Sequence, residues 1–299
     1  MQGYTLKVDA DAIALMTFDL PGKVNVMNDD FMSAMEELLG RLERQRSTLH
    51  GVILTSAKPT FFAGGDLEFM VRAEKGQEEF LFSHYERLKS YFRRLEKLGL
   101  PVVAAINGTA LGGGFELCLA CHRRIAVLKP KALIGLPEVS FGILPAAGGV
   151  IRLTGLLGLT PALEFLTTGQ KVDVETALKR GLVDQVVETV EEMIAEARAW
   201  ILSGPEPVQP WDRPRQLGSH QLPGAIRAEL AGLPAWLGQR VDREDRAVMR
   251  IADIAAESLF IDFDTASRIE TRGFVELVLG PTAKQRIAAF FDPLGARAV

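Results

Sequence analysis

The amino-acid sequence predicts an α/β protein with a helical C-terminal region. From residue 4 to about residue 190, short apolar runs typical of β-strands alternate with longer segments whose apolar residues recur at helical spacing. After about residue 195 the strand signals end, and a stretch rich in proline and polar residues at 204–223 indicates a boundary or hinge. We therefore expect two parts, a core at 1–200 and a helical region at 201–299.

Periodicity and capping residues predict the individual elements. Alternating apolar and polar residues predict a strand pair near the N-terminus, joined by a turn at 9–11, and continuous apolar runs predict buried strands. Asp29 or Asp30 can cap a first helix that runs to Gln45. The predicted strands are 4–8, 13–18, 51–55, 101–106 and 124–127. The further predicted helices are 78–98, 115–122, 225–230, 242–259, 264–279 and 282–291.

The composition is that of a globular protein and disfavours several classes of partner. The 299 residues are 47% hydrophobic, which is enough to bury a sizeable core. The formal net charge is -4, and the lysines and arginines are scattered, so we do not expect nucleic acid as a partner. Residues 1–20 lack the basic start and the continuous apolar run of a secretion signal, which predicts a cytoplasmic location.

Three other features, a membrane span, covalent haem attachment and a metal site, can be considered, and the sequence argues against each. Residues 101–121 could suggest a membrane span, but they include Glu116, and a carboxylate is costly in lipid. Cys118, Cys121 and His122 have the spacing of covalent haem attachment, which belongs with exported proteins. The four histidines form no ligand pairs, so we expect no metal site. Both cysteines are better explained as small hydrophobic residues buried in the core.

Glu116 is a candidate for chemistry because its neighbours are hydrophobic on every side of the predicted helix. Such a helix is buried, and a buried carboxylate costs several kcal/mol unless it is paired, hydrogen-bonded or neutralised. An ion pair with a distant arginine, such as Arg123 or Arg152, would explain it as well as a catalytic role would.

Glu138 lies in an apolar segment that glycine and proline punctuate, which is typical of a loop that lines a site. The alternative is an exposed glutamate at a helix start after Pro137. If Glu116 and Glu138 share one pocket, their pKa values would separate, which would leave one carboxyl protonated and one ionised. That pair could perform general acid and base catalysis.

Two glycine-rich turns follow predicted strands, at 63–66 and at 108–114. Neither matches the dinucleotide-binding fingerprint, and no Lys-Ser or Lys-Thr follows as a phosphate-binding loop requires. On the glycines alone, a tight turn is the commonest explanation. A helix that starts after such a turn would still present free N–H groups, a site that suits negative charge.

Several segments together indicate a family. They are Phe-Ala-Gly-Gly-Asp-Leu at 62–67, the run at 101–108, Gly-Gly-Gly-Phe-Glu-Leu at 112–117, Leu-Pro-Glu-Val at 136–139 and the run at 145–149. In this order they resemble the successive signatures of the enoyl-CoA hydratase/isomerase (crotonase) superfamily. Residues 20–25 and 266–291 are similar to the hydratase half of multifunctional fatty-acid oxidation proteins. Two residues depart from the family pattern: Gly65 stands where alanine is common, and Ala146 where glycine is usual.

The resemblance implies a crotonase-like spiral of ββα units and catalysis on a coenzyme A thioester. The backbone N–H groups of Gly65 and Gly113 would form an oxyanion hole for the thioester carbonyl. Glu116 would hold and activate a water molecule that adds to the β-carbon, and Glu138, protonated, would deliver a proton to the α-carbon.

The coenzyme would be part of the substrate, so the resemblance implies no separate cofactor. Its nucleotide end would lie near Lys23 and near Ala63, Gly64 and Asp66. A lysine that is simply solvated on a turn is the alternative for Lys23.

The function implied is enoyl-CoA hydratase, a lyase of fatty-acid β-oxidation that converts trans-2-enoyl-CoA into 3-hydroxyacyl-CoA. The alternatives are a 3-enoyl-CoA isomerase and a non-catalytic docking subunit of a fatty-acid oxidation complex. The resemblance also implies a homo-oligomer, trimer or hexamer, with a dehydrogenase or thiolase as a further partner. The length of the acyl chain does not follow from the sequence.

Overall fold

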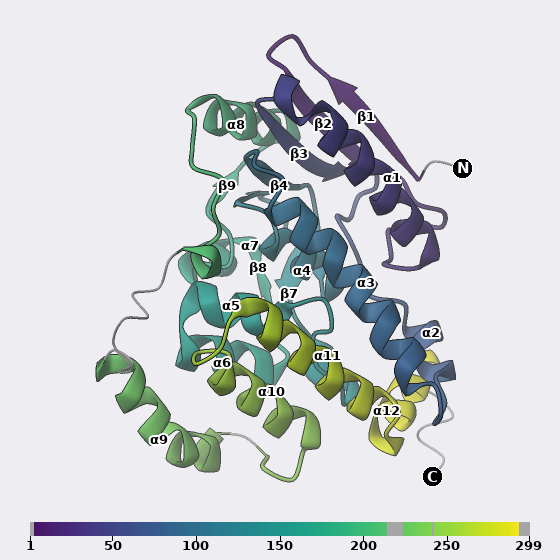
Figure 1. Ribbon diagram of the computed structural model, residues 1–299, viewed down its shortest axis with the longest axis vertical. Coiled ribbons are helices and arrows are strands. Elements are labelled where there is room, and N and C mark those ends of the chain that lie inside the picture. The colour runs from purple at the N-terminus through teal and green to yellow at the C-terminus, as the bar shows by residue number, and fades with distance from the viewer. Residues whose placement is uncertain (1–2, 214–223, 241, 293–299) are drawn as a thin grey trace. The chain divides into compact units, whose positions relative to one another are not determined.

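The computed structural model describes residues 3–213, 224–240 and 242–292, and it is a mixed α/β structure (Figure 1). Proximity between Cα atoms groups these residues into two compact units. The first unit consists of described residues within 1–66, 87–135 and 171–209, and the second of those within 67–86, 136–170 and 210–299. The division into 1–200 and 201–299 stays a prediction.

A six-stranded sheet forms the centre of the first unit. Its first two strands are antiparallel, and each further neighbour pairs in parallel. The order across the sheet is β1 (Tyr4–Val8), β2 (Ile13–Phe18), β3 (Gly51–Ser56), β4 (Val102–Ile106), β6 (Arg123–Val127) and β9 (Gln185–Val187). The strands that the sequence predicts are therefore present to within one residue.

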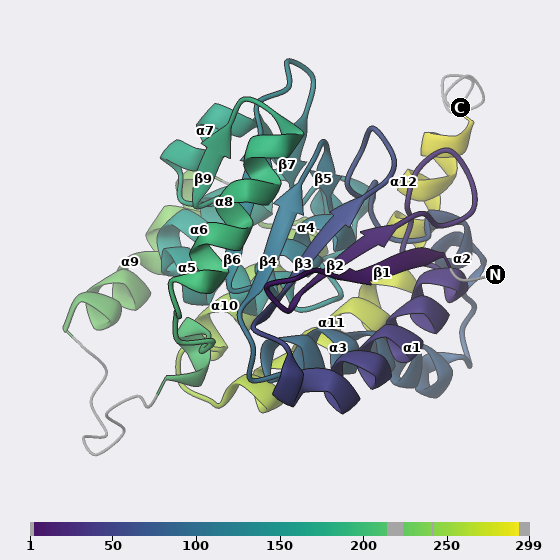
Figure 2. The same ribbon diagram turned by 90° about the horizontal axis from the view of Figure 1, so that it is seen from above.

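Side chains alternate between the two faces of this sheet, and each face packs against helices. One face packs on α8 (Val190–Leu202) through residues such as Ile53, Val103 and Ile201. On the other, Phe18 contacts Phe31 of α1 (Asp29–Gln45), with ring centroids 5.7 Å apart. Figure 2 shows α1 and α8 on opposite faces of the sheet.

Helix α1 differs from the expectation at its start. Asn28, and not Asp29 or Asp30, is the N-cap: its backbone is extended and its side chain accepts a hydrogen bond from the Phe31 N–H. The two aspartates lie in the first turn, where negative charge interacts favourably with the helix dipole.

Shorter elements complete the first unit. A second sheet of three strands consists of β5 (Ala110–Leu111), β7 (Leu133–Gly135) and β8 (Lys171–Asp173). Helix α4 (Gly113–Leu119) follows β5 directly and ends three residues before the predicted end. The remaining helices of this unit are η1 (Arg46–Thr48), the second half of α3 (Glu78–Glu96) and α7 (Val174–Lys179).

The second unit is helical and includes the described residues of the predicted C-terminal helical region from 210 onward. Its elements are α2 (Leu67–Arg72), the first half of α3, η2 (Glu138–Phe141), α5 (Gly149–Leu157), α6 (Leu159–Thr168), η3 (Pro210–Asp212), α9 (Gly224–Arg240), α10 (Arg246–Glu257), α11 (Phe263–Val278) and α12 (Pro281–Phe291). Helix α10 starts later than expected because Asp245 caps it and accepts from the Ala247 N–H. The predicted hinge at 204–223 lies in part outside the described residues.

Two polar contacts, one buried and one part-buried, hold helices of the second unit together. The carboxylate of Glu270 on α11 accepts hydrogen bonds from the Val150 and Ile151 N–H groups, at the start of α5. The ammonium of Lys284 on α12 donates to the carbonyls of Met70 and Val71, at the end of α2, at 3.0 and 2.8 Å. Both contacts satisfy helix-terminal groups that have no partner within their own helix.

Within the described ranges, no helix combines the length and the apolar character that crossing a membrane would require. Both cysteine side chains are 0% exposed, as expected for core residues. The Sγ of Cys118 donates to the Gly114 carbonyl, and that of Cys121 to the Leu117 carbonyl. Burial raises the pKa of the Cys118 thiol, which further suppresses the reactive thiolate.

We therefore expect both thiols to be inert in the folded protein. A chromogenic disulfide reagent should label them more than about 10³-fold more slowly in buffer than in denaturant, because labelling requires unfolding. The measurement is the time course of thiolate release at neutral pH, with and without denaturant. Rapid labelling of either cysteine in buffer would contradict the buried position.

Candidate functional site

The glycine loop that precedes α2 is held by backbone hydrogen bonds to two neighbouring segments. On one side, the N–H groups of Phe61 and Phe62 donate to the Thr109 carbonyl, and the Leu111 N–H donates to the Phe62 carbonyl. On the other side, Ala63 N–H donates to the Asn25 carbonyl, and the Met27 N–H to the Gly64 carbonyl. The loop therefore behaves as a short strand between residues 25–27 and 109–111.

Buried amide side chains fix the base of this loop. Asn25 is fully buried; its Oδ1 accepts from the Leu20 N–H at 3.0 Å, and its Nδ2 donates to Ser56 Oγ at 2.9 Å and to the Phe61 carbonyl at 3.1 Å. The Asn107 Nδ2 donates to the carbonyls of Ser56 and Lys58, at 3.0 and 2.8 Å. Residue type and spacing alone do not indicate these two roles, although an asparagine that ends an apolar run, as Asn107 does, is a detectable signal.

The predicted coenzyme A-binding residues lie around the same loop. Ala63 is exposed, Gly64 is buried and has φ of +131°, and Asp66 is half-buried. Lys23 is exposed, on a turn whose Gly22 carbonyl accepts a hydrogen bond from Lys58. Contact of these residues with the coenzyme stays a prediction.

The second glycine turn leads directly into α4. Gly112 has φ of +52° and ψ of −130°, a conformation that is strained for residues with a side chain. Its N–H donates to the Gly135 carbonyl, and its own carbonyl accepts from the N–H groups of Phe115 and Glu116. This turn determines where the first N–H of α4, that of Gly113, lies.

The structure brings the Gly65 and Gly113 backbones together from these two turns. A Cβ atom built on Gly113 would lie 3.6 Å from the Gly65 nitrogen. Among residues 3–213, 224–240 and 242–292, neither the Gly65 nor the Gly113 N–H donates to a main-chain carbonyl. Two adjacent donors of this kind can stabilise a developing negative charge on one oxygen.

Glu116 lies one helical turn beyond Gly113. Its side chain is 2% exposed, and every residue of α4 is buried, as the apolar sequence predicts. Residues three apart share a helix face, and helical side chains tilt toward the N-terminus, which directs Glu116 back toward the Gly113 end of the helix. Residues 65, 113 and 116 are thus neighbours within the first unit.

Glu138 belongs to the second unit, where it is the first residue of η2 and is half-buried. Helix α12 holds this segment, because Arg286 donates to the Val139 carbonyl at 3.1 Å. The Ile143 N–H donates to the Glu138 carbonyl, which closes the turn. The meeting of Glu138 with Glu116 stays a prediction.

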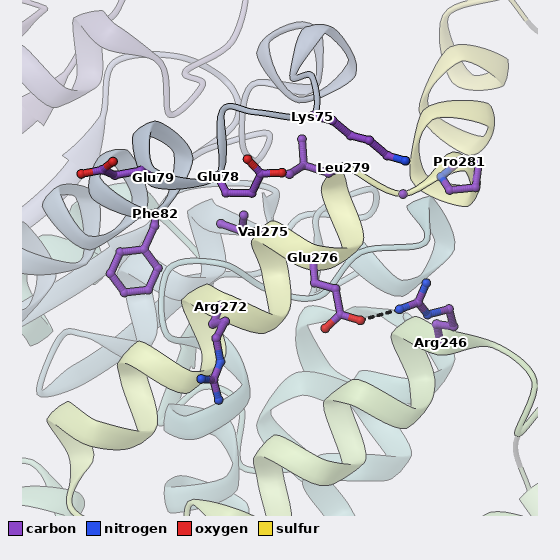
Figure 3. Close-up of a pocket in the computed structure, with 11 residues that line it drawn as sticks. Lys75, Glu78, Glu79, Phe82, Arg246, Arg272, Val275, Glu276, Leu279 and Pro281 are labelled. Carbon is purple, nitrogen blue, oxygen red and sulfur yellow. Dashed lines mark hydrogen bonds and ion pairs between the residues drawn. The ribbon is translucent and has the colours of Figure 1, made fainter.

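A separate groove of about 720 Å³ lies in the second unit (Figure 3). Phe82, Val275, Leu279 and Pro281 contribute apolar surface, and most of the other lining residues are charged, among them the ion pair of Arg246 with Glu276. It includes none of the predicted site residues. Within the described ranges, no group of three or more His, Cys, Asp or Glu side chains is arranged to hold a metal ion.

Comparison with known proteins identifies the family. The family model for enoyl-CoA hydratase/isomerase matches residues 9–204. The chain belongs to the enoyl-CoA hydratase/isomerase family. The expected crotonase-like α/β fold with a C-terminal helical region is thereby confirmed.

Solved structures that are similar to this chain agree with this assignment. An enoyl-CoA hydratase from Bacillus anthracis is 28% identical, with a TM-score of 0.61, over 86% of this chain and 90% of that one. The DspI protein of Pseudomonas aeruginosa is 30% identical, with a TM-score of 0.61, over 80% and 94%. Human mitochondrial delta3-delta2-enoyl-CoA isomerase, 24% identical, shares the fold with a TM-score of 0.70 over 100% of both chains. Members named for two different activities are therefore similar to this chain.

The asparagine network yields a prediction for stability. Replacing Asn25 by alanine leaves the buried Leu20 N–H without its acceptor and should lower the free energy of unfolding by roughly 2–4 kcal/mol. The measurement is equilibrium unfolding in urea. Ser33→Ala is the control: its hydroxyl is exposed on α1, and the change should stay within about 0.5 kcal/mol. Equal effects of the two substitutions would show that the network contributes little.

Proposed function

We propose that the protein is an enoyl-CoA hydratase that adds water reversibly across the 2,3 double bond of a trans-2-enoyl-CoA. The product would be a 3-hydroxyacyl-CoA, as in fatty-acid β-oxidation. The observation that carries this proposal is the adjacency of the Gly65 and Gly113 amides, with Glu116 one helical turn away. Membership of the family supplies the thioester as the substrate class.

The two amides act on the thioester carbonyl. When water adds to the β-carbon, electron density moves through the conjugated system onto the carbonyl oxygen, which becomes an enolate. Hydrogen bonds from two fixed N–H groups are stronger to this oxygen than to the neutral carbonyl, so they lower the barrier. Glycine at both positions lets the thioester approach the main chain closely.

The two glutamates move the protons. The Glu116 carboxylate takes a proton from the attacking water as its oxygen bonds to the β-carbon. The protonated Glu138 gives its proton to the α-carbon, which collapses the enolate back to the thioester. The reverse reaction exchanges these roles.

The remaining assignments follow from the same proposal. The coenzyme A portion of the substrate would lie along Ala63, Gly64 and Asp66, with Lys23 contributing charge to a phosphate, and no other cofactor is needed. We also propose a cytoplasmic homo-oligomer, trimer or hexamer, that passes its product to a dehydrogenase or thiolase partner.

Substitution of the two glutamates tests the mechanism. Glu116→Gln and Glu138→Gln keep the side-chain size but cannot accept or deliver the proton, so each should slow hydration by about 10²–10⁴-fold. The measurement is the loss of ultraviolet absorbance as a trans-2-enoyl-CoA is hydrated. Glu164→Gln, at an exposed position on α6, is the matched control and should keep the parent rate.

The same assay separates the alternatives. If the parent interconverts 3-enoyl-CoA and 2-enoyl-CoA without hydration, and only one glutamate is required, the protein is an isomerase. If the parent binds the thioester but turns over neither substrate, it is a docking subunit. Full hydration activity in both glutamine variants would contradict the proposed roles.

A further inference from the structure

Met27 lies against both of the glycines that carry the proposed oxyanion hole. Its N–H donates to the Gly64 carbonyl at 3.0 Å, and Met27 forms an isolated parallel bridge with Gly65. The residue is buried, at 8% exposure. The Met27 backbone is therefore paired with the Gly65 segment, which carries one of the two proposed donors, and the Met27 side chain is shielded from solvent.

The Met27 side chain occupies the space that a side chain at Gly113 would need. A Cβ atom built on Gly113 would lie 2.7 Å from the Met27 Sδ and 3.6 Å from its Cγ. The same Cβ would be 3.6 Å from the Gly65 nitrogen. Methionine at 27 and glycine at 113 are thus complementary in size, beside both N–H donors.

We propose that Met27 is a positioning residue that sets the spacing between the Gly65 and Gly113 amides. This inference rests on the proposed function, because the spacing between the two amides matters only if both bind the same thioester carbonyl oxygen. The thioether packs against Gly113, while the backbone bridge ties the same residue to Gly65. A displacement of the Met27 side chain therefore changes the distance between the two donors.

The chemistry of a thioether suits this task. Sulfur is a weak hydrogen-bond acceptor, so Met27 does not compete with the substrate oxygen for the two N–H groups. The unbranched side chain fills an irregular gap and excludes water that would otherwise solvate the donors. Donors that are fixed and dry stabilise developing charge more than hydrated ones do.

A size-swap cycle tests the proposal. Met27→Ala removes the packing, and Gly113→Ala forces a methyl group against the sulfur, so each change alone should slow hydration at least about tenfold and lower the melting temperature. In the double variant, the new methyl group at 113 fills the space that Met27 vacates. The hydration rate and the melting temperature should then recover. The double variant should be about five- to fiftyfold faster than the two single effects, added together, would predict.

A second readout reports the oxyanion hole itself. An enoyl-CoA whose double bond is conjugated to an aromatic ring should absorb at longer wavelength when the two amides polarise its carbonyl. We expect the parent and the double variant to shift this absorbance on binding, and each single variant to shift it less. A general loss of core packing would not reduce the absorbance shift in the single variants and restore it in the double variant.

Two control variants sharpen the result. A Cβ built on Gly114 would meet the Phe62 Cβ at 2.4 Å, not Met27, so Met27→Ala should not rescue Gly114→Ala. Met27→Leu keeps the volume without the sulfur and should stay close to the parent.

Strictly additive effects of Met27→Ala and Gly113→Ala would overturn the proposal, and so would equal rescue of Gly114→Ala. If Gly113→Ala fails to fold, recovery of folding in the double variant supports the proposal and its failure to fold overturns it. If the parent neither hydrates the thioester nor shifts its absorbance on binding, the proposed function is wrong, and the proposal for Met27 is wrong with it. If the parent shifts the absorbance of the bound thioester but the effects of the two substitutions are additive, the proposal for Met27 is wrong and the proposed function still holds.

Discussion

The hydrogen bonds that hold residues 61–65 between two neighbouring chain segments are the constraint on which the proposed site depends. Without them the Gly65 amide would have no fixed direction, because glycine restricts the backbone less than any other residue. Asn25 contributes to this loop twice, through its side chain to the Phe61 carbonyl and through its backbone to the Ala63 N–H. A flexible residue type thus becomes a fixed donor, because its neighbours in space remove the freedom that its sequence allows.

Burial of a carboxylate is weak evidence for catalysis in this protein. Glu96 is buried and forms an ion pair with Arg93 at 3.0 Å, and Glu270 is buried and receives two N–H groups at the start of α5. Both contacts give a buried carboxylate partners within the fold, which compensates part of the cost of its burial. What distinguishes Glu116 is its position, one helical turn from a glycine amide that lies beside a second amide. A catalytic role for Glu116 therefore depends on the two amides near it and not on its burial.

Much of the fold could be predicted because local patterns agree with tertiary packing. Strands such as 13–18 and 102–106 are apolar because both faces of the sheet are covered, and the motif order at 62–67 and 112–117 is specific enough to indicate the family. Helix boundaries were predicted less well. The start of α1 depends on the conformation of Asn28, and the end of α4 on the turn that leads from Leu119 into β6. These are choices between neighbouring residues of similar propensity, and periodicity does not resolve them.

The sequence by itself determined the α/β class, the family, the buried position of Glu116 and the two glycine-rich turns at 63–66 and 108–114. These properties follow from residue type and spacing, which set burial and local backbone freedom. Only the tertiary structure decided that the amides of residues 65 and 113 are adjacent, that Asn25 and Asn107 fix the base of the loop, and that Met27 packs against Gly113. The reason is physical: chain segments far apart in sequence meet through hydrogen bonds and packing that no local pattern encodes.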